Sequence, residues 1–365
     1  MLLARGRGTM SRLNSARSIL MLALLSAACH RHPPVGDIQP QEVETTLFLI
    51  GDAGEQDPRQ PSLVLDSLKR QAAAAPNPII VFLGDNVYPN GIPRDSSVEF
   101  ADARRRLRAQ VDAVPANARA FFVPGNHDWS QGTAYGLYSV RLQEDLIRAM
   151  ARGRDIRMLP GNGCPGPVAV DAGRLRLIAL DTQWWLHDFI VHDSVSNCPR
   201  TTGQVTDSLR KLLRSTADGR IAIPVGHHPM MTGGIHGGYC GITGPFRRLG
   251  GASQDILSSL NRQMRDSLEA AFSAKPPLLY AAGHDHSLQV MKGAPNAQYF
   301  VVSGAGSQDK TECSVYMRES YYVSQHRVGF MRVEILRNKG VVLRVFDFSG
   351  AGVPGRLFAR WLEER

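Results

Sequence analysis

Cysteine is scarce in this chain of 365 residues, and none of its five cysteines belongs to a Cys-x-x-Cys pair. That spacing marks zinc ribbons and thioredoxin-like redox sites, so neither kind of site is expected. The sequence also lacks a Gly-x-Ser-x-Gly elbow, which argues against a Ser-His-Asp hydrolase. It holds no internal repeat and no low-complexity tract, and its 43% of hydrophobic residues is typical of a globular protein.

Long basic runs are also missing, although the formal net charge is +9. Four of the positive charges lie in residues 1–28, which hold no acidic residue, and the longest basic run elsewhere is Arg104–Arg106. A weak and dispersed positive field suits a small anionic substrate as well as a polyanion. Charge alone therefore does not identify the partner.

The first thirty residues contain an apolar run that is too short to span a membrane. Four arginines precede this run, Ile19–Leu25, and small residues follow it before Cys29. A basic region, a short apolar region and a small-residue cleavage site are typical of a secretory signal peptide. We predict a signal peptide over residues 1–28 and an exported linker over residues 29–43. An ordinary buried helix is the alternative.

Cys29 gives the predicted export two versions. A cysteine directly after small residues resembles the bacterial lipobox, in which the cysteine becomes the lipidated N-terminus. Ser26 stands where that motif usually has leucine, so simple cleavage and release is the second version. We expect a protein of the bacterial cell envelope, either a lipoprotein with a lipid anchor in the membrane or a periplasmic protein, or else a secreted one.

Export also affects the interpretation of the remaining cysteines. Disulfides persist in oxidising compartments, and an even number of cysteines is left after Cys29. We predict two disulfides, for which the sequence allows three pairings and selects none. The cysteines are Cys164, Cys198, Cys240 and Cys313.

Short apolar runs that end in a polar loop with glycine or proline recur along the chain and are typical of strands buried on both faces. They cover Leu47–Ile50, Ile79–Leu83, Ala120–Val123, Leu175–Leu180, Ile221–Val225 and Leu278–Ala282. Helical periodicity between them covers Leu63–Ala73, Ala101–Val111, Val205–Leu213 and Ile256–Phe272. This alternation predicts an α/β layered domain with ligands outside the carboxyl ends of the strands.

Three later apolar runs have little helix between them, and we expect them to form a second sheet. They are Tyr299–Ser303, Val328–Leu336 and Val341–Phe348. The prediction is one domain of two packed sheets flanked by helices, which we place at residues 44–350, with a C-terminal tail over residues 351–365.

Residues of the types that bind metal ions in proteins follow the predicted strands. They are Asp52, Asp85, Asn126, His127, His227, His284 and His286. Each one alone is more often a turn residue, a cap or a surface histidine. Independent turns would not place acid, acid, Asn-His, His and His-x-His after successive strands. Oxygen and imidazole donors gathered at one edge of a sheet suit two adjacent metal ions.

In these positions the chain resembles the calcineurin-like metallophosphoesterases, and within them the purple acid phosphatases of the small tartrate-resistant type. The five blocks are Gly51-Asp52-Ala53-Gly54, Gly84-Asp85-Asn86-Val87-Tyr88, Gly125-Asn126-His127-Asp128, Gly226-His227-His228-Pro229 and Gly283-His284-Asp285-His286. The resemblance spans about residues 46–310. It implies the metallophosphoesterase fold, a four-layer α/β/β/α sandwich of two mixed sheets in a single domain.

Two departures from the general superfamily pattern point to the purple acid phosphatases. Gly54 stands where most members have a histidine ligand of the first metal. Tyr88 stands where the purple acid phosphatases place a tyrosinate on a ferric ion. A phenol with a pKa of about 10 needs a strongly acidic metal such as Fe(III) to ionise near neutral pH. An ordinary loop aromatic is the alternative for Tyr88.

The resemblance also implies a ligand set for two metal ions. The first, Fe(III), takes Asp52, Tyr88, His286 and the bridging Asp85. The second, which is Fe(II), Zn or Mn, takes Asp85, Asn126, His227 and His284. A further departure is His228, which stands where the tartrate-resistant enzymes usually have tyrosine, so the pocket wall is expected to differ.

His127 and His236 correspond to the substrate-side histidines of the family. We expect the glycine-rich loop Gly233–Gly238 to be able to swing His236 over the metals. A protonated histidine there stabilises the phosphate and protonates the leaving alkoxide.

The implied activity is the hydrolysis of small phosphate monoesters by a metal-bound hydroxide, with an acidic optimum and no nucleic-acid partner. The same site acting on a phosphodiester, a nucleotide pyrophosphate or a phosphoprotein is the nearest alternative. A surface lipoprotein that binds phosphate or metal without turnover is another. Pure binding needs no proton donor, which argues against that last version.

Overall fold

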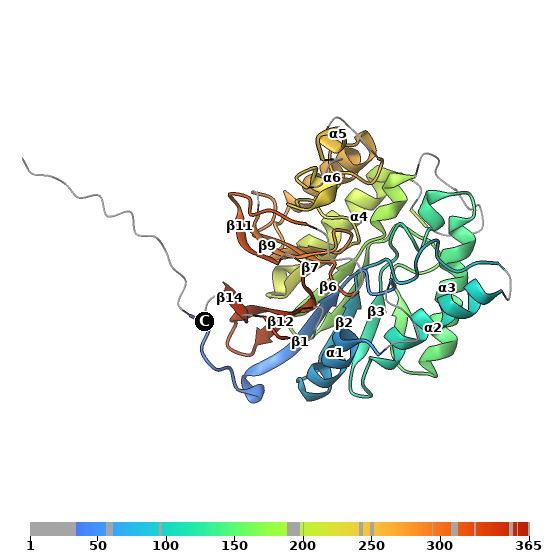
Figure 1. Cartoon of the computed structure of the whole chain (residues 1–365). Helices are drawn as coiled ribbons and strands as arrows, with labels where there is room; N and C mark the ends of the chain where they lie inside the picture. The colour runs from blue at the N-terminus through green and yellow to red at the C-terminus, as the bar shows by residue number, and fades with distance from the viewer. Residues whose placement is uncertain are drawn as a thin grey trace, which may run out of the picture. The chain divides into compact units, whose positions relative to one another are not determined.

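The computed structural model describes residues 34–55, 61–94, 97–187, 198–199, 201–240, 244–248, 252–293, 295–307, 313–324, 326–349, 353–355 and 357–363. Within this part of the chain, two seven-stranded sheets pack face to face (Figure 1). The predicted signal peptide and Cys29 lie outside the described residues. No helix in the described part of the chain is long and apolar enough to cross a membrane.

The first sheet has the strand order β14-β13-β12-β1-β2-β3-β4. Strands β1 to β4 run parallel, and β12, β13 and β14 continue the sheet beyond β1 in antiparallel pairs. The strands are β1 Val43–Ile50, β2 Pro78–Phe82, β3 Arg119–Phe122, β4 Ile156–Met158, β12 Val328–Leu336, β13 Val341–Phe348 and β14 Phe358–Glu363.

The second sheet has the order β11-β9-β10-β8-β7-β6-β5. Strands β6, β7, β8 and β10 run parallel, while β5, β9 and β11 pair antiparallel at its two sides. The strands are β5 Val168–Ala172, β6 Leu175–Ala179, β7 Ile221–Val225, β8 Leu279–Ala282, β9 Leu288–Lys292, β10 Tyr299–Ser303 and β11 Ser320–Ser324.

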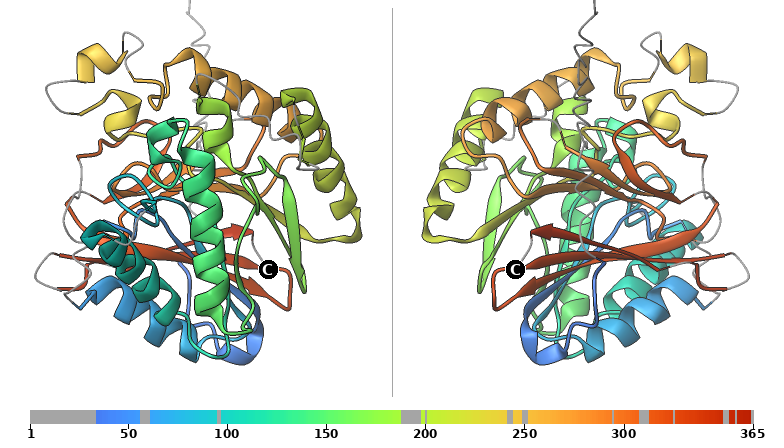
Figure 2. Two further views of the ribbon diagram at one scale, coloured as in Figure 1. Left: turned by 90° about the vertical axis from the view of Figure 1, so that its right-hand side faces the viewer. Right: turned by 90° about the vertical axis from the view of Figure 1, so that its left-hand side faces the viewer.

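Helices cover the outer face of each sheet, which completes four layers (Figure 2). Against the first sheet lie α1 Leu63–Ala74, α2 Val98–Asp112 and α3 Gly136–Ala151, and against the second lie α4 Thr202–Arg214 and α6 Ser259–Phe272. The short elements are α5 Gly244–Arg248, η1 Pro40–Glu42, η2 Ser130–Gly132, η3 Thr182–Leu186, η4 Ser215–Asp218 and η5 Ile235–Gly237. Side-chain oxygens of Ser62, Ser97, Thr201 and Ser258 cap α1, α2, α4 and α6, so these starts are set locally.

The alternation of side chains along β1 shows why the apolar runs are continuous. Leu47 and Leu49 point into the core between the two sheets, whereas Phe48 and Ile50 point into the core beneath the helices. All four are fully buried, and burial of each contributes roughly 1.5–3 kcal/mol. A strand with an apolar layer on both faces cannot show a polar position at every second residue.

The predicted four-layer sandwich of two mixed sheets is confirmed, with two differences. Of the three late runs expected to form the second sheet, only Tyr299–Ser303 lies there, as β10, while β12 and β13 extend the first sheet beside β1. The sheet also continues past the predicted boundary at residue 350, because Phe358–Glu363 pairs with β13. Residues 351–365, predicted as a tail, therefore contain an edge strand.

Candidate metal centre

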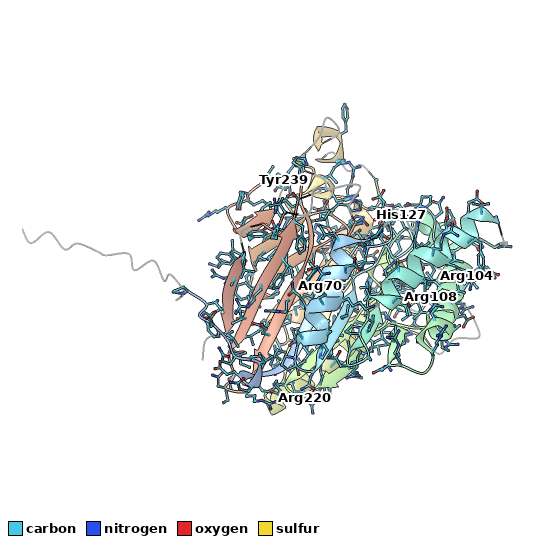
Figure 3. The ribbon with its side chains drawn as sticks, turned by 60° about the horizontal axis from the view of Figure 1, so that its bottom comes forward. Arg70, Arg104, Arg108, His127, Arg220 and Tyr239 are labelled. Carbon is cyan, nitrogen blue, oxygen red and sulfur yellow. A yellow bond between two sulfur atoms is a disulfide. The ribbon has the colours of Figure 1, made fainter. Side chains whose placement is uncertain are left out.

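The predicted ligands meet where strands of both sheets end. Asp52, Asp85 and Asn126 follow β1, β2 and β3 of the first sheet, whereas His227 and His284 follow β7 and β8 of the second. We expected one edge of one sheet, and the structure instead uses the facing carboxyl ends of two. Figure 3 shows His127 and Tyr239 towards one end of the molecule and Arg220, which precedes β7, towards the other.

Three of these ligand residues have an unusual backbone conformation. Asp52, Asp85 and His284 adopt φ values of 58°, 53° and 72°, in the left-handed region that non-glycine residues rarely occupy. Each directly follows the glycine at the end of its strand. Such strain concentrates at functional sites, where the surrounding structure imposes it. The turn brings each ligand side chain towards the space between the two sheets.

The first group of candidate metal-ligand atoms surrounds the hydroxyl of Tyr88. This oxygen lies 3.1 Å from Asp52 Oδ1, 3.1 Å from Asp85 Oδ2 and 3.0 Å from His286 Nε2. The four donor atoms come from three different loops, and all four side chains line or adjoin the same buried space. These are the four residues predicted for the first metal.

The second group surrounds His227 Nε2. This nitrogen lies 3.0 Å from Asn126 Oδ1, 3.2 Å from His284 Nδ1 and 3.3 Å from Asp85 Oδ2. The other ring nitrogen, Nδ1, donates to the carbonyl of Leu83 at 2.8 Å, which leaves the lone pair of Nε2 facing the group. These are the four residues predicted for the second metal.

The donor separations fit two metal ions that share one carboxylate. Two ligand atoms bound at about 2.1 Å and at right angles on one ion lie roughly 3 Å apart, which is the spacing seen in both groups. Asp85 Oδ2 belongs to both, because it lies near Tyr88 and near His227. Asp85 Oδ1 instead accepts the backbone N–H of His127 at 2.9 Å. A single oxygen of Asp85 would thus be shared between two ions held by these groups.

Electrostatics within the protein alone also indicate a cation between these groups. Burial, followed by the charges of Asp85 and Asp52, raises the pKa of the Tyr88 phenol well above its ordinary value. Burial disfavours the charged forms of both Asp85 and His227. Their mutual attraction outweighs burial, so the pKa of Asp85 is lowered and the pKa of His227 is raised to about 9. The carboxylates of Asp85 and Asp52 thus favour positive charge beside His227, which a metal ion held by these groups would supply.

His228 lies close enough to join a metal cluster with His227 and His284, but its ring nitrogens are already used. Nδ1 lies 2.9 Å from Thr182 Oγ1, and Nε2 lies 2.7 Å from Gln254 Oε1. Burial, with the charge of His227 next, lowers the pKa of His228 well below its ordinary value, so the ring is neutral. His228 is fully buried and lies behind the cavity, where it contacts the lining residue Gln254.

The two predicted substrate-side histidines are brought to the site as well. His127 Nδ1 lies 2.5 Å from the carbonyl oxygen of Pro89, and the ring lies over Tyr88 with its centroid at 4.0 Å. The ring of His236 stacks on His284 with centroids 3.9 Å apart. Both histidines line one cavity of about 580 Å³ together with Asp85, Tyr88, Asn126, His284 and His286. This volume suits a small ligand.

The loop of His236 is hydrogen-bonded to neighbouring segments in this structure. Within Gly233–Gly238, the N–H of Gly233 donates to Gln289 at 2.8 Å and that of His236 to Asp285 Oδ1 at 3.0 Å. Asp285 lies between two ligand histidines in the sequence, so the loop is tied to the metal-binding segment. His236 lines the cavity in this arrangement, and its swing over the metals stays a prediction.

Three comparisons with known proteins agree with this geometry. Residues 35–288 match the family model of the calcineurin-like phosphoesterases. The chain belongs to this family. "Purple acid phosphatase 17" of Arabidopsis thaliana is 25% identical over 270 residues, which cover 72% of this chain and 68% of that protein. "Purple acid phosphatase 4" of the same plant is 24% identical over 343 residues, which cover 90% and 85%.

The solved structure titled "GAP50 the anchor in the inner membrane complex of Plasmodium" shares the fold. It superposes with a TM-score of 0.53 at 17% identity and covers 88% of this chain and 90% of that one. The predicted family resemblance and the predicted fold are therefore confirmed. The Asp and His cluster makes this calcineurin-like phosphoesterase a metal-binding protein of the phosphate-ester hydrolase class.

The structure explains why the first block of this phosphoesterase carries Gly54. A Cβ atom at this position would overlap the backbone carbonyl of Asn86, because the two loops touch there. The phenol of Tyr88, two residues after Asn86, fills the space beside Asp52. The lost histidine and the added tyrosine are thus parts of one packing arrangement.

Several residues that support the ligands were not found by sequence reasoning. Gln131 Oε1 accepts from Asn126 Nδ2 at 3.1 Å, which turns the amide oxygen towards His227. Asp128 is buried and accepts the backbone N–H groups of Gly125, Asn86 and Val87, which ties two ligand loops together. Asp128 belongs to the block Gly125-Asn126-His127-Asp128, so its position was a usable signal.

Proposed function

We propose that this protein is a phosphatase of the purple acid phosphatase kind that hydrolyses small phosphate monoesters. The observation that carries the proposal is the Tyr88 phenol, which lies 3.1 Å from both Asp52 and Asp85. A phenol among buried carboxylates is a poor ligand for a weakly acidic cation. We therefore assign Fe(III) to the first group and Fe(II), Zn or Mn to the second.

The residues present divide the reaction between them. Two cations held by these groups would neutralise phosphate oxygens and lower the pKa of a water molecule. His127 lines the cavity, with Nδ1 2.5 Å from the carbonyl oxygen of Pro89 and Nε2 3.3 Å from Gln131 Nε2, and its ring is placed to contact a phosphate oxygen. His236 lines the same cavity from η5 and is placed to give a proton to the leaving oxygen. Protonated histidines favour an acidic optimum.

Hydrolysis of p-nitrophenyl phosphate by the purified protein, beside its bis-ester, tests the proposal. We expect the monoester to be hydrolysed with the larger kcat/KM at mildly acidic pH, and Asp85→Ala to abolish the activity. A larger kcat/KM for the bis-ester would replace the proposal with a phosphodiesterase. Two bound metal ions without turnover of either ester would make the protein a phosphate- or metal-binding one.

One solved structure of similar fold is titled an anchor protein, but at 17% identity that likeness shows the fold and not a non-catalytic role. The proton-donating histidines at the cavity favour catalysis over capture. We further propose export to the cell envelope, through the leader over residues 1–28 and with Cys29 as a lipid attachment point. The paired cysteines described below support an oxidising compartment.

A further inference from the structure

The segment that follows His236 returns to the cavity and brings a carboxylate to the ring of this histidine. Asp255 Oδ1 lies 2.9 Å from His236 Nδ1, and the Asp255 side chain is 1% exposed. The backbone N–H of Ile256 also donates to the carbonyl of His236 at 3.0 Å. Asp255 lies 19 residues after His236, so the fold, and no local turn, makes this pairing.

Asp255 is itself fixed by two more donors. Arg247 Nη1 donates to Asp255 Oδ1 at 2.7 Å, and the N–H of Ala252 donates to Oδ2 at 3.1 Å. Arg247 Nη1 also lies 3.3 Å from His236 Nδ1. An ionised carboxylate can only accept hydrogen bonds, so His236 Nδ1 is the donor to Asp255. His236 Nδ1 and Arg247 Nη1 both donate to Asp255 Oδ1, and this brings the two nitrogens to 3.3 Å from each other.

We propose that Asp255 is the positioning residue that fixes His236 with its Nδ1 proton on the carboxylate and Nε2 in the cavity. This role rests on the proposed phosphatase function. In the reaction, water supplies the oxygen that bonds to phosphorus while the bond from phosphorus to the ester oxygen breaks. The ester oxygen keeps the electron pair and takes the proton from His236 Nε2. The water gives up one proton to solvent, which restores the one on Nε2.

The loop geometry supports a fixed ring. A Cβ at Gly234 would come within 2.6 Å of the Asp285 carboxyl carbon, so the backbone there packs directly on the segment between the two ligand histidines. Stacking on His284 fixes the plane of the His236 ring. The hydrogen bond to Asp255 then decides which ring nitrogen faces the carboxylate and which faces the substrate.

The test compares leaving groups, because p-nitrophenolate leaves without a proton and an alkoxide does not. For Asp255→Asn, we expect kcat on glycerol phosphate to fall about 100-fold while kcat on p-nitrophenyl phosphate stays within about threefold. KM and metal content should stay unchanged, since His236 and the metal ligands remain. Asp266→Asn, an exposed acid on α6, is the control and should lower neither rate. Equal losses on the two esters, or no loss, would overturn the assignment.

A second measurement reads the state of the His236 ring without turnover. In ¹⁵N-edited NMR of wild-type protein loaded with diamagnetic Zn²⁺, we expect a proton on His236 Nδ1, assigned with His236→Asn. Absence of a proton on Nδ1 contradicts the role of Asp255, whatever the protein hydrolyses. Absence of hydrolysis with the Nδ1 proton present rejects the phosphatase proposal alone.

Discussion

The hydroxyl oxygen of Tyr88 lies 3.1 Å from a carboxylate oxygen of Asp85, three residues before it in the same loop. A buried phenol so close to a carboxylate resists ionisation, as the raised pKa of Tyr88 shows. Only a strongly acidic cation between the two oxygens makes the phenolate favourable. With Fe(III) bound there as proposed, the colour of the protein would report on this contact.

We expect the purified protein to show a broad visible charge-transfer band, and Tyr88→Phe to remove it. Activity should fall less than in Asp85→Ala, because Tyr88 contacts one group and Asp85 both. The measurement is the visible spectrum of each variant at equal iron content. Tyr135→Phe, which loses a hydroxyl that donates to Ile92 O, is the control and should keep the band. A colourless wild-type protein with a full metal complement would leave a metallophosphoesterase without iron.

We expect Gly54→Ala to destabilise the protein by about 1–3 kcal/mol and to lower its metal content, because the new Cβ displaces the Asn86 loop. Gly54→His should not restore the histidine ligand of other family members, for the same reason. The measurements are thermal unfolding and metal analysis. Gly36→Ala is the matched control, since nothing lies within 4 Å of a Cβ there. Equal behaviour of the two alanine variants would show that the contact is not limiting.

Asp181 should make the protein less stable as the pH rises. Burial raises its pKa to about 7, although Trp129 Nε1 donates to it at 2.7 Å. The unfolded chain loses this proton near pH 4, so between about pH 4 and 7 the folded state binds more protons and stability falls with pH. The shift corresponds to about 4 kcal/mol.

Asp181→Asn should remove this dependence, because the amide oxygen still accepts from Trp129 and carries no proton equilibrium. Relative to wild type, the variant should gain up to about 4 kcal/mol in unfolding free energy between pH 4 and pH 7.5. Denaturant titrations at both pH values measure the gain, with the exposed Asp145→Asn as control. A difference that does not change with pH contradicts the buried-acid account.

In exported protein, none of the four cysteines in the described part of the chain should be a free thiol. Cys164 pairs with Cys198 and Cys240 with Cys313, with Cα atoms 5.3 and 5.8 Å apart. The second bridge joins the segment after His236 to the one before β11. Non-reducing peptide mass spectrometry should find both linked peptides, and two or more free thiols would refute the pairing.

The grouping of the proposed metal ligands could be predicted because most of them follow the end of a buried strand within a short motif. The strand runs show where chain segments end, and parallel strands bring those ends together. Sheet membership could not be predicted in the same way. Val328–Leu336 and Tyr299–Ser303 have similar apolar patterns, yet they lie in different sheets, because pairing partners are chosen in the tertiary fold.

Some features that the sequence analysis missed had a local signal, and others had none. Helix α3 was missed although Val140, Ile147 and Met150 recur on one face and were an available signal. Asp255 and Arg247 carried no signal, since neither belongs to a motif and 19 residues separate Asp255 from His236. Their role depends on how the chain returns to the cavity, which local pattern does not encode.

The bridging oxygen of Asp85 is the centre of this account, and metal content per chain tests it most directly. Asp85 Oδ2 lies beside both Tyr88 and His227, so its loss removes a ligand from two ions at once. Mass spectrometric metal analysis of purified protein should give two ions per chain in wild type and fewer than one in Asp85→Ala. Two ions retained in Asp85→Ala, or a single ion in wild type, would contradict a centre bridged by this carboxylate.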